Sequence, residues 1–218
     1  MVGVLATAIN LFGFGFRQPI TLVKWPASLL RLSFGGSFNQ PITGVKWPAN
    51  LQQLSFGSRF KQSITGVVWP ASLQQLSFAS GFETPIAEVS WPASLQQLSF
   101  EKFFYQPITG VMWPASPQRL SFSSIFNQPT TGVVWPASLL QLTFGDHFDL
   151  PIGGVVWPAS LKQLTFGDDS DQPFAGVIWP ASLQLSFGAY FDQPIAEVVW
   201  PASLQSVTHA SESVLFRV

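Results

Sequence analysis

Charged residues are scarce in this sequence, and cysteine is absent. Only 10% of the 218 residues are Asp, Glu, Lys or Arg, whereas a typical soluble domain carries about 25%. The lack of cysteine excludes disulfides, thiolate metal ligands and a cysteine nucleophile. No apolar run approaches the roughly 18 residues of a membrane-spanning helix, so we expect no membrane span. The apolar start lacks a basic n-region, so the compartment stays unknown, with the cytoplasm favoured.

Proline and aromatic residues are abundant instead. The chain contains 18 Pro, 21 Phe and 9 Trp, and 47% of its residues are hydrophobic. Frequent proline excludes long helices, because proline lacks the backbone N–H and clashes with the preceding turn. The aromatic and aliphatic content excludes disorder.

The tryptophans mark an internal repeat. Successive tryptophans are 22 residues apart, except that the last two are 21 apart because one residue is missing within residues 182–187. A fixed period of about 20 to 29 residues is typical of a leucine-rich-repeat-sized solenoid. The column consists of Trp25, Trp47, Trp69, Trp91, Trp113, Trp135, Trp157, Trp179 and Trp200.

Each repeat predicts one coil of this solenoid. Leu32 and Phe34 alternate with Arg31 and Ser33, which is the period-2 pattern of a half-buried strand. Corners are expected at the glycine and small polar residues, and the Trp-Pro step should be extended. One coil buries too little apolar surface to offset the ordering of its own backbone, so the coils must stack.

The repeat covers nearly the whole chain, so we predict a single domain over residues 1–218. About ten strands should form one parallel sheet, from residues 10–12, with Asn10 in the leucine column, to residues 205–208. The predicted parts are an N-terminal partial repeat at residues 10–24, tandem repeats at residues 25–199 and a degenerate C-terminal cap at residues 200–218.

A sequence motif in the repeat is similar to that of a known family. One stretch reads Leu29-x-x-Leu32-x-Phe34-Gly35-x-x-Phe38-Asn39-Gln40-Pro41-Ile42, and this pattern resembles the FNIP repeat. The resemblance implies an interaction scaffold without catalytic residues. It also implies a mainly β, leucine-rich-repeat-like right-handed solenoid of about ten 22-residue coils with a parallel β-sheet along one face. The motif asparagine remains only at Asn39 and Asn127, so a continuous asparagine ladder is not expected.

The outward face of the predicted sheet is the first candidate partner surface. Its Ser, Thr, Gln and Arg side chains form either a partner-binding face or a solvated face with side-chain hydrogen-bond ladders. Ice or sugar binding by the repeating hydroxyls is a further alternative. The candidate partner-binding residues are Arg31, Ser33, Gln53, Ser55, Gln75, Ser77, Gln97, Ser99, Arg119 and Ser121. The variable turn residues expected to add to recognition are Ser37, Arg59, Lys102, Ile125, His147 and Asp169.

The tryptophan column allows two interpretations. Trp47 alternates with Val45 on the inward side, which favours a core position with the indole N–H bonded to a neighbouring carbonyl. Exposed indoles would instead make the chain a carbohydrate-binding module, which is the alternative function.

A further column, which we call the outward valine column, immediately precedes the tryptophans. If the segment around each tryptophan is extended, these side chains point outward and mark a protein interface or an aggregation-prone edge. Its apolar members are Val68, Met112, Val134, Val156, Ile178 and Val199, whereas Lys24 and Lys46 occupy the same column in the first coils.

The ionisable residues are sorted along the chain and yield two further hypotheses. Basic residues gather in residues 1–61 and acidic residues in residues 146–197. Asp149, Asp171 and Asp192 share one column, so their oxygens could bind Ca²⁺ weakly. A pair of carboxylates could cleave glycans, and the candidate acids for that reaction are Glu83, Glu88 and Glu101.

These observations favour a non-enzymatic scaffold for protein–protein interaction through the strand face and the variable turns. We expect a protein partner and no nucleic acid, because the basic residues are too sparse for a nucleic-acid surface. No cofactor and no metal are expected. Self-association through the coil ends or the outward valine column is left open.

Overall fold

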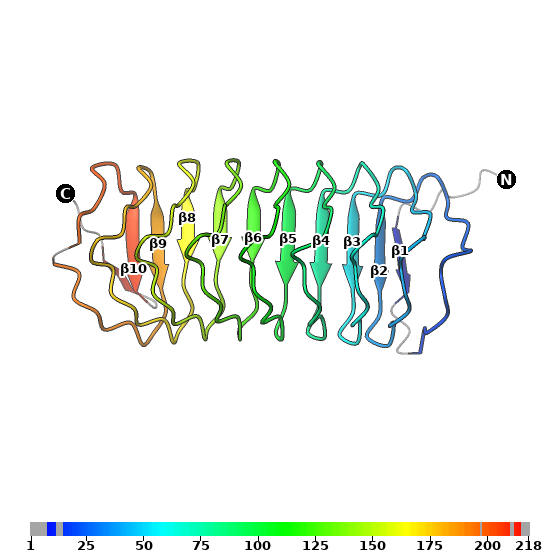
Figure 1. Cartoon of the computed structure of the whole chain (residues 1–218), viewed down its shortest axis with the longest axis horizontal. Helices are drawn as coiled ribbons and strands as arrows, with labels where there is room; N and C mark the ends of the chain where they lie inside the picture. Colours follow the sequence, from blue (N-terminus) through cyan, green and yellow to red (C-terminus); the bar gives the residue numbers. More distant parts are fainter. Residues whose placement is uncertain (1–7, 12–14, 197, 210–211, 215–218) are drawn as a thin grey trace.

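The computed structural model describes residues 8–11, 15–196, 198–209 and 212–214. Over these residues the chain forms a curved stack of coils, and each coil contributes one short strand (Figure 1). No helix that could cross a membrane is found among the described residues. The strands are β1 (Ala8–Leu11), β2 (Arg31–Phe34), β3 (Gln53–Phe56), β4 (Gln75–Phe78), β5 (Gln97–Phe100), β6 (Arg119–Ser121), β7 (Gln141–Thr143), β8 (Gln163–Thr165), β9 (Gln184–Phe187), β10 (Ser206–His209) and β11 (Glu212–Val214).

All eleven strands belong to one sheet, in which they follow their order in the chain. Neighbouring strands from β1 to β10 are parallel and pair residues one repeat apart, so that Leu54 lies opposite Leu76 and Ser55 opposite Ser77. Within each strand from β2 to β9 the leucine is buried and the preceding residue is more exposed, as the alternating sequence predicts. The predicted leucine-rich-repeat-like solenoid with a parallel sheet along one face is therefore confirmed.

The two ends of the sheet differ from the prediction. Ile9 lies opposite Leu32 and Asn10 lies opposite Ser33, so the placement of Asn10 in the leucine column is wrong by one residue. The apolar Ile9 packs against the core and keeps the buried column continuous. Phe12, the predicted end of this strand, lies outside the described residues.

At the other end, β10 spans Ser206–His209, one residue later than predicted. Beyond it, β11 turns back and pairs with β10 in the antiparallel direction, which the repeat does not predict. The antiparallel strand gives β10 hydrogen-bond partners at the edge of the parallel stack.

The missing residue near position 182 does not interrupt the sheet. Gln184 still lies opposite Gln163, and Leu183 is fully buried like its equivalents in other coils. The deletion therefore shortens the segment between the buried leucine and the strand, and one coil absorbs it.

Three β-turns close most coils, although Pro117 has no N–H to close the third turn of its coil. In the second coil, backbone hydrogen bonds join Phe38 N to Gly35 O at 3.1 Å, Val45 N to Ile42 O at 3.2 Å, and Leu51 N to Pro48 O at 3.1 Å. The middle turn places Gly44 at a φ of 80°, in the left-handed region that side chains disfavour. The predicted corners after the strand and at Thr43-Gly44 are confirmed, and the turn that begins at Pro48 is a third corner that the sequence analysis did not predict.

The core consists of aromatic and aliphatic columns that run the length of the stack. Phe34 and Phe38 stack on each other within one coil, with ring centroids 4.2 Å apart. Each ring also stacks on its equivalent in the next coil, so every coil depends on its neighbours for burial.

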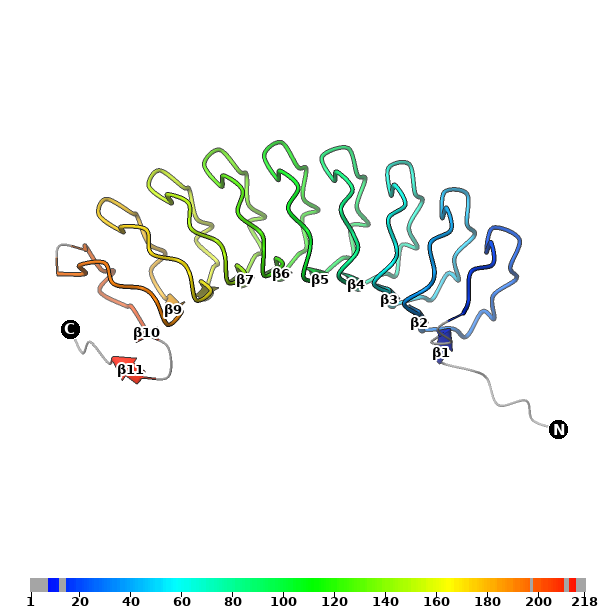
Figure 2. The same ribbon diagram turned by 90° about the horizontal axis from the view of Figure 1, so that it is seen from below.

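The spacing of these columns matches the curvature of the solenoid. Hydrogen-bonded strands lie about 4.8 Å apart. The ring centroids of Phe34 and Phe56, its equivalent in the next coil, are 5.4 Å apart. The corresponding distance is 6.0 Å between Phe38 and Phe60 and 6.4 Å between Trp47 and Trp69. Because the coils are wider apart away from the sheet, the stack bends, and Figure 2 shows the sheet lining the inner side of the arc.

Candidate interaction surfaces

The concave face of the sheet carries the predicted partner-binding residues. Each strand from β2 to β9 presents Gln or Arg at its first position and Ser or Thr at its third, and these side chains are half-buried or exposed. From β2 to β9, the outward positions of the strands hold Arg31 and Arg119 and no acidic residue. The face is therefore polar, regular and weakly basic.

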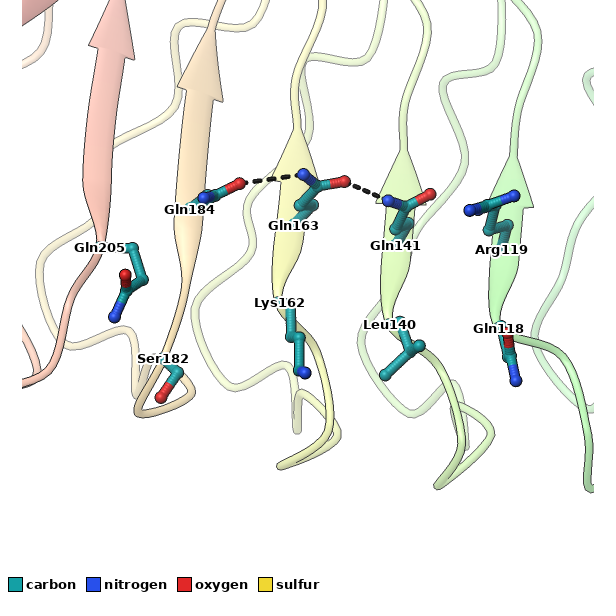
Figure 3. Close-up of a pocket in the computed structure, with 9 residues that line it drawn as sticks. All are labelled: Gln118, Arg119, Leu140, Gln141, Lys162, Gln163, Ser182, Gln184 and Gln205. Atoms are coloured by element: carbon teal, nitrogen blue, oxygen red, sulfur yellow. Dashed lines mark hydrogen bonds between the residues drawn. The ribbon is translucent and has the colours of Figure 1, made fainter.

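Glutamine side chains form a hydrogen-bond ladder on the C-terminal part of this face. Gln141 Nε2 donates to Gln163 Oε1, and Gln163 Nε2 donates to Gln184 Oε1 at 2.9 Å. Figure 3 shows the three side chains in a row across β7, β8 and β9. The side-chain ladders considered from the sequence are therefore present here, and they hold the carboxamides in one orientation.

Two hollows lie on the concave face. The first, of about 320 Å³, is lined by six of the predicted residues, namely Arg31, Ser33, Gln53, Ser55, Gln75 and Ser77. The second, of about 480 Å³, contains Arg119 among the predicted residues. Gln97, Ser99 and Ser121 lie on the strands between these two groups and line neither hollow.

The second hollow also contains residues that sequence reasoning missed. Lys162 and Gln118 reach it from the segment just before the strand (Figure 3), and Lys162 adds a third cation to the concave face. The signal was present in the sequence, because the residue before each strand is polar in most repeats. The period-2 pattern identifies outward positions only within the strand, so it does not indicate that the residue before the strand also lines the concave face.

The predicted turn residues are not equally accessible. Ser37 lies in the turn after β2 and is buried, with 8% of its surface exposed, so its prediction as an accessible recognition residue is wrong. His147 Nδ1 lies in hydrogen-bond contact with Asp169 Oδ2 of the next coil. Of the other predicted turn residues, Arg59, Lys102 and His147 are exposed, and Ile125 and Asp169 are half-buried.

The column of acidic residues has a structural role. Asn127 Oδ1 accepts the backbone N–H of Asp149 at 3.2 Å, and Asp149 Oδ1 in turn accepts that of Asp171 at 3.0 Å. Asp171 Oδ1 accepts the N–H of Asp192 at 2.8 Å. The asparagine ladder is not continuous, as expected, but aspartate supplies the same kind of acceptor across these coils, which the sequence analysis did not predict. Asparagine and aspartate place the same acceptor oxygen at this position.

The same bond occurs in the N-terminal half, where Asn39 Oδ1 accepts the backbone N–H of Lys61 at 2.9 Å. Lys61 then forms an ion pair with Glu83, with Nζ and Oε1 3.2 Å apart. Of the other acids considered for glycan cleavage, Glu88 is exposed in the middle turn of its coil and Glu101 is exposed just after β5. Among the described residues, no group of three His, Asp or Glu is arranged to hold a metal ion.

The tryptophan column belongs to the core. Trp69, Trp135, Trp157 and Trp179 are buried with 6% to 8% of their surface exposed, and the other indoles are half-buried against the core. The expected hydrogen bond to a carbonyl is wrong for eight of them, because the buried indole N–H finds no acceptor among the described residues. The indoles pack instead edge-on against phenylalanine rings, as Trp135 does against Phe144. A carbohydrate-binding platform of exposed indoles does not fit this arrangement.

The outward valine column is exposed as predicted. Its six apolar members are each 80% to 84% exposed, although the residues on either side of them are buried or half-buried. The segment around each tryptophan is therefore extended, with Val133 and Trp135 inward and Val134 outward.

Comparisons with known proteins agree with the repeat and the fold. The FNIP repeat family profile matches residues 38–81 and 126–169. Among solved structures, the chain is similar to one described as that of CroV588, a novel circular LRR protein, with 38% sequence identity and a TM-score of 0.71. The similarity covers 84% of this chain and 30% of that protein, so the chain spans less than a third of its length. No curated protein matches this chain significantly. The resemblance seen in the motif is confirmed: residues 38–81 and 126–169 are FNIP repeats, and the fold is leucine-rich-repeat-like.

Proposed function

We propose that this chain is a non-enzymatic scaffold that binds a protein partner on the concave face of its sheet. The observation that carries the proposal is the composition of that face: from β2 to β9 each strand presents Gln or Arg together with Ser or Thr, half-buried or exposed, and Lys162 lies beside them. A polar array of this kind offers a partner many donors and acceptors in fixed positions.

The charges of the face indicate the kind of partner. A surface with three cations and no acid on strands β2 to β9 attracts acidic surfaces and repels basic ones. Because the sheet lies on the inner side of the arc, the matching surface is convex and acidic (Figure 2). The glutamine ladder supports the proposal, because side chains that are already ordered lose little entropy on binding.

An affinity experiment tests this proposal. The immobilised full chain is compared with a Ser55→Glu, Ser77→Glu variant, which places two acids in the N-terminal hollow. The matched control is Thr65→Glu, Thr109→Glu, which adds the same charge at exposed turn positions away from the sheet. We expect partner recovery from the native organism to be lost with the first variant and kept with the control. Equal recovery by both variants would contradict the role of the concave face.

A further inference from the structure

An exposed apolar stripe follows one wall of the solenoid, away from the concave face. Five consecutive coils contribute one side chain each, and every one of these side chains is at least 80% exposed. The apolar stripe consists of Met112, Val134, Val156, Ile178 and Val199. Contiguous apolar surface on this scale is typical of an interaction site.

The coil itself does not require apolar residues at these positions. Lys46 stands at the same position in the second coil, followed by Trp47 just as Val134 is followed by Trp135. The inward neighbours Val45 and Val133 are equally buried, at 5% exposure. Since the coil has the same form with an exposed lysine, the apolar character of the stripe serves contacts outside the coil.

The surroundings of the first four stripe residues can also be removed from water without burying charge, whereas Glu197 lies two residues before Val199. No Asp, Glu, Lys, Arg or His occurs in the segments that carry the first four stripe residues, which are residues 108–117, 130–139, 152–161 and 174–183. Burying an unpaired charge is costly, so a surface free of charge is suited to complete desolvation. In the coils outside the stripe, Lys24, Lys46 and Glu88 are exposed on the same wall.

The wall has a regular spacing that a second copy shares. Hollows lie between neighbouring stripe residues: one of about 490 Å³ is lined by Met112 and Val134, and one of about 480 Å³ by Val134 and Val156. A third, of about 310 Å³, is lined by Ile178 and Val199. Because the stripe residues follow one another coil by coil, two copies of the stripe match in spacing when a two-fold axis brings them together.

We infer that the apolar stripe is the contact surface of a two-fold homodimer, with the second copy of this chain as its occupant. The two stripes run antiparallel, with Val156, the middle residue of the five, nearest the axis. A stable dimer buries about 800 Å² on each side, so the contact extends from the five stripe residues to the wall segments around them. A net charge of −1 repels a second copy only weakly. The dimer leaves both concave faces free and is independent of the function proposed for them.

Disulfide cross-linking tests the axis, because the chain has no cysteine of its own. In a full-length Val156→Cys variant, the two thiols meet at the axis, so we expect a covalent dimer under mild oxidation. The two ends of the stripe are tested with Met112→Cys and Val199→Cys. Each of these variants alone should stay monomeric on a reducing-agent-free gel, whereas a mixture of the two should cross-link. Self-cross-linking at all three positions, or at none, would overturn the antiparallel arrangement.

Mass measurements test the dimer itself. Light scattering of the wild-type chain should give twice its 23.9 kDa at micromolar concentration, and a Val134→Lys, Val156→Lys variant should be monomeric, with dimerisation weakened about 100-fold or more. A Gln75→Lys, Gln97→Lys variant adds the same charge on the concave face and should remain dimeric. If the lysine variant fails to fold, Val134→Ser, Val156→Ser replaces it, because Ser90 occupies this column. A monomeric wild type, a mass that grows without limit, or a dimer unaffected by the stripe variants refutes the inference.

Discussion

Asp149 Oδ1 accepts the backbone N–H of Asp171, one coil further along the solenoid, at 3.0 Å. The same oxygen accepts a hydrogen bond from Gln172 Nε2 at 2.9 Å. The aspartate thus replaces the motif asparagine as an acceptor, but it adds a negative charge close to that of its neighbour. Hydrogen bonding favours the residue at this position, and repulsion between stacked carboxylates opposes it.

The first prediction concerns the charge of this ladder. In Asp149→Asn the carboxamide keeps the acceptor oxygen, as Asn127 does, and removes the repulsion. We expect its melting temperature to equal or exceed that of the wild type at about 10 mM salt, with the difference shrinking at about 1 M salt as charges are screened. Asp149→Ala should lose about 1 to 3 kcal/mol, because it leaves partly buried donors without an acceptor. An asparagine variant as unstable as the alanine variant at both salt concentrations would show that the ladder requires the charge.

The second prediction concerns the indole N–H groups. Trp135 is 6% exposed, and its Nε1 is buried without an acceptor among the described residues. Trp135→Ala should cost about 3 to 5 kcal/mol through the cavity it leaves. Trp135→Phe should cost clearly less, because it keeps an aromatic ring and removes an unsatisfied donor. Urea denaturation followed by circular dichroism measures both, and equal losses would indicate that the indole N–H contributes to stability.

The third prediction uses two adjacent phenylalanines. Phe104 is fully buried and stacks on Phe100 at 4.1 Å, whereas Phe103 is 42% exposed beneath Lys102. Phe104→Ala should therefore cost about 3 to 5 kcal/mol. Phe103→Ala should cost less than about 1 kcal/mol, the scale of an exposed cation–π contact. Thermal unfolding of the two variants tests the assignment, and similar losses would place Phe103 in the core.

The fourth prediction compares two adjacent glycines in the middle turn of one coil. Gly154 has a φ of 77°, whereas Gly153 does not adopt the left-handed region, and neither would place a Cβ within 4 Å of another atom. Gly154→Ala should destabilise the chain by about 1 to 2 kcal/mol through backbone strain alone. Gly153→Ala should stabilise it by about 0.4 to 1 kcal/mol, because the unfolded chain loses freedom. Stability changes of the same sign in both variants would contradict the turn geometry.

Much of the fold was predictable because one physical pattern recurs in every coil. The alternation of Leu54 and Phe56 with polar residues specifies which side of the strand is buried, and the fixed period specifies the register with the next strand. The corner at Gly44 follows from the need for a residue that tolerates positive φ. These features depend on local sequence and on contact with an identical neighbour, so a single sequence contains them.

The features that the sequence analysis did not predict depend on contacts and geometry that the repeating pattern does not specify. Strand β11 pairs in the reverse direction and belongs to no repeat, so periodicity gives no signal for it. The ladder through Asp149 does not follow from a motif defined by residue type, because the backbone requires only an acceptor oxygen at that place. The variability at Ser37 indicates a surface position, whereas the depth of the turn buries it. The hollows on the concave face depend on the spacing between neighbouring coils, and no column of the repeat predicts that spacing.

The unequal spacing of strands and aromatic rings has a consequence for how such a chain changes over generations. Each coil adds a similar wedge, because the rings in the column of Phe38 stay 6.0 to 6.3 Å apart from Phe16 to Phe148. Duplicating or losing a whole 22-residue unit therefore preserves the radius of the arc and rotates one end relative to the other by a constant angle. The number of units therefore sets the length of the concave face, while every strand keeps its local environment.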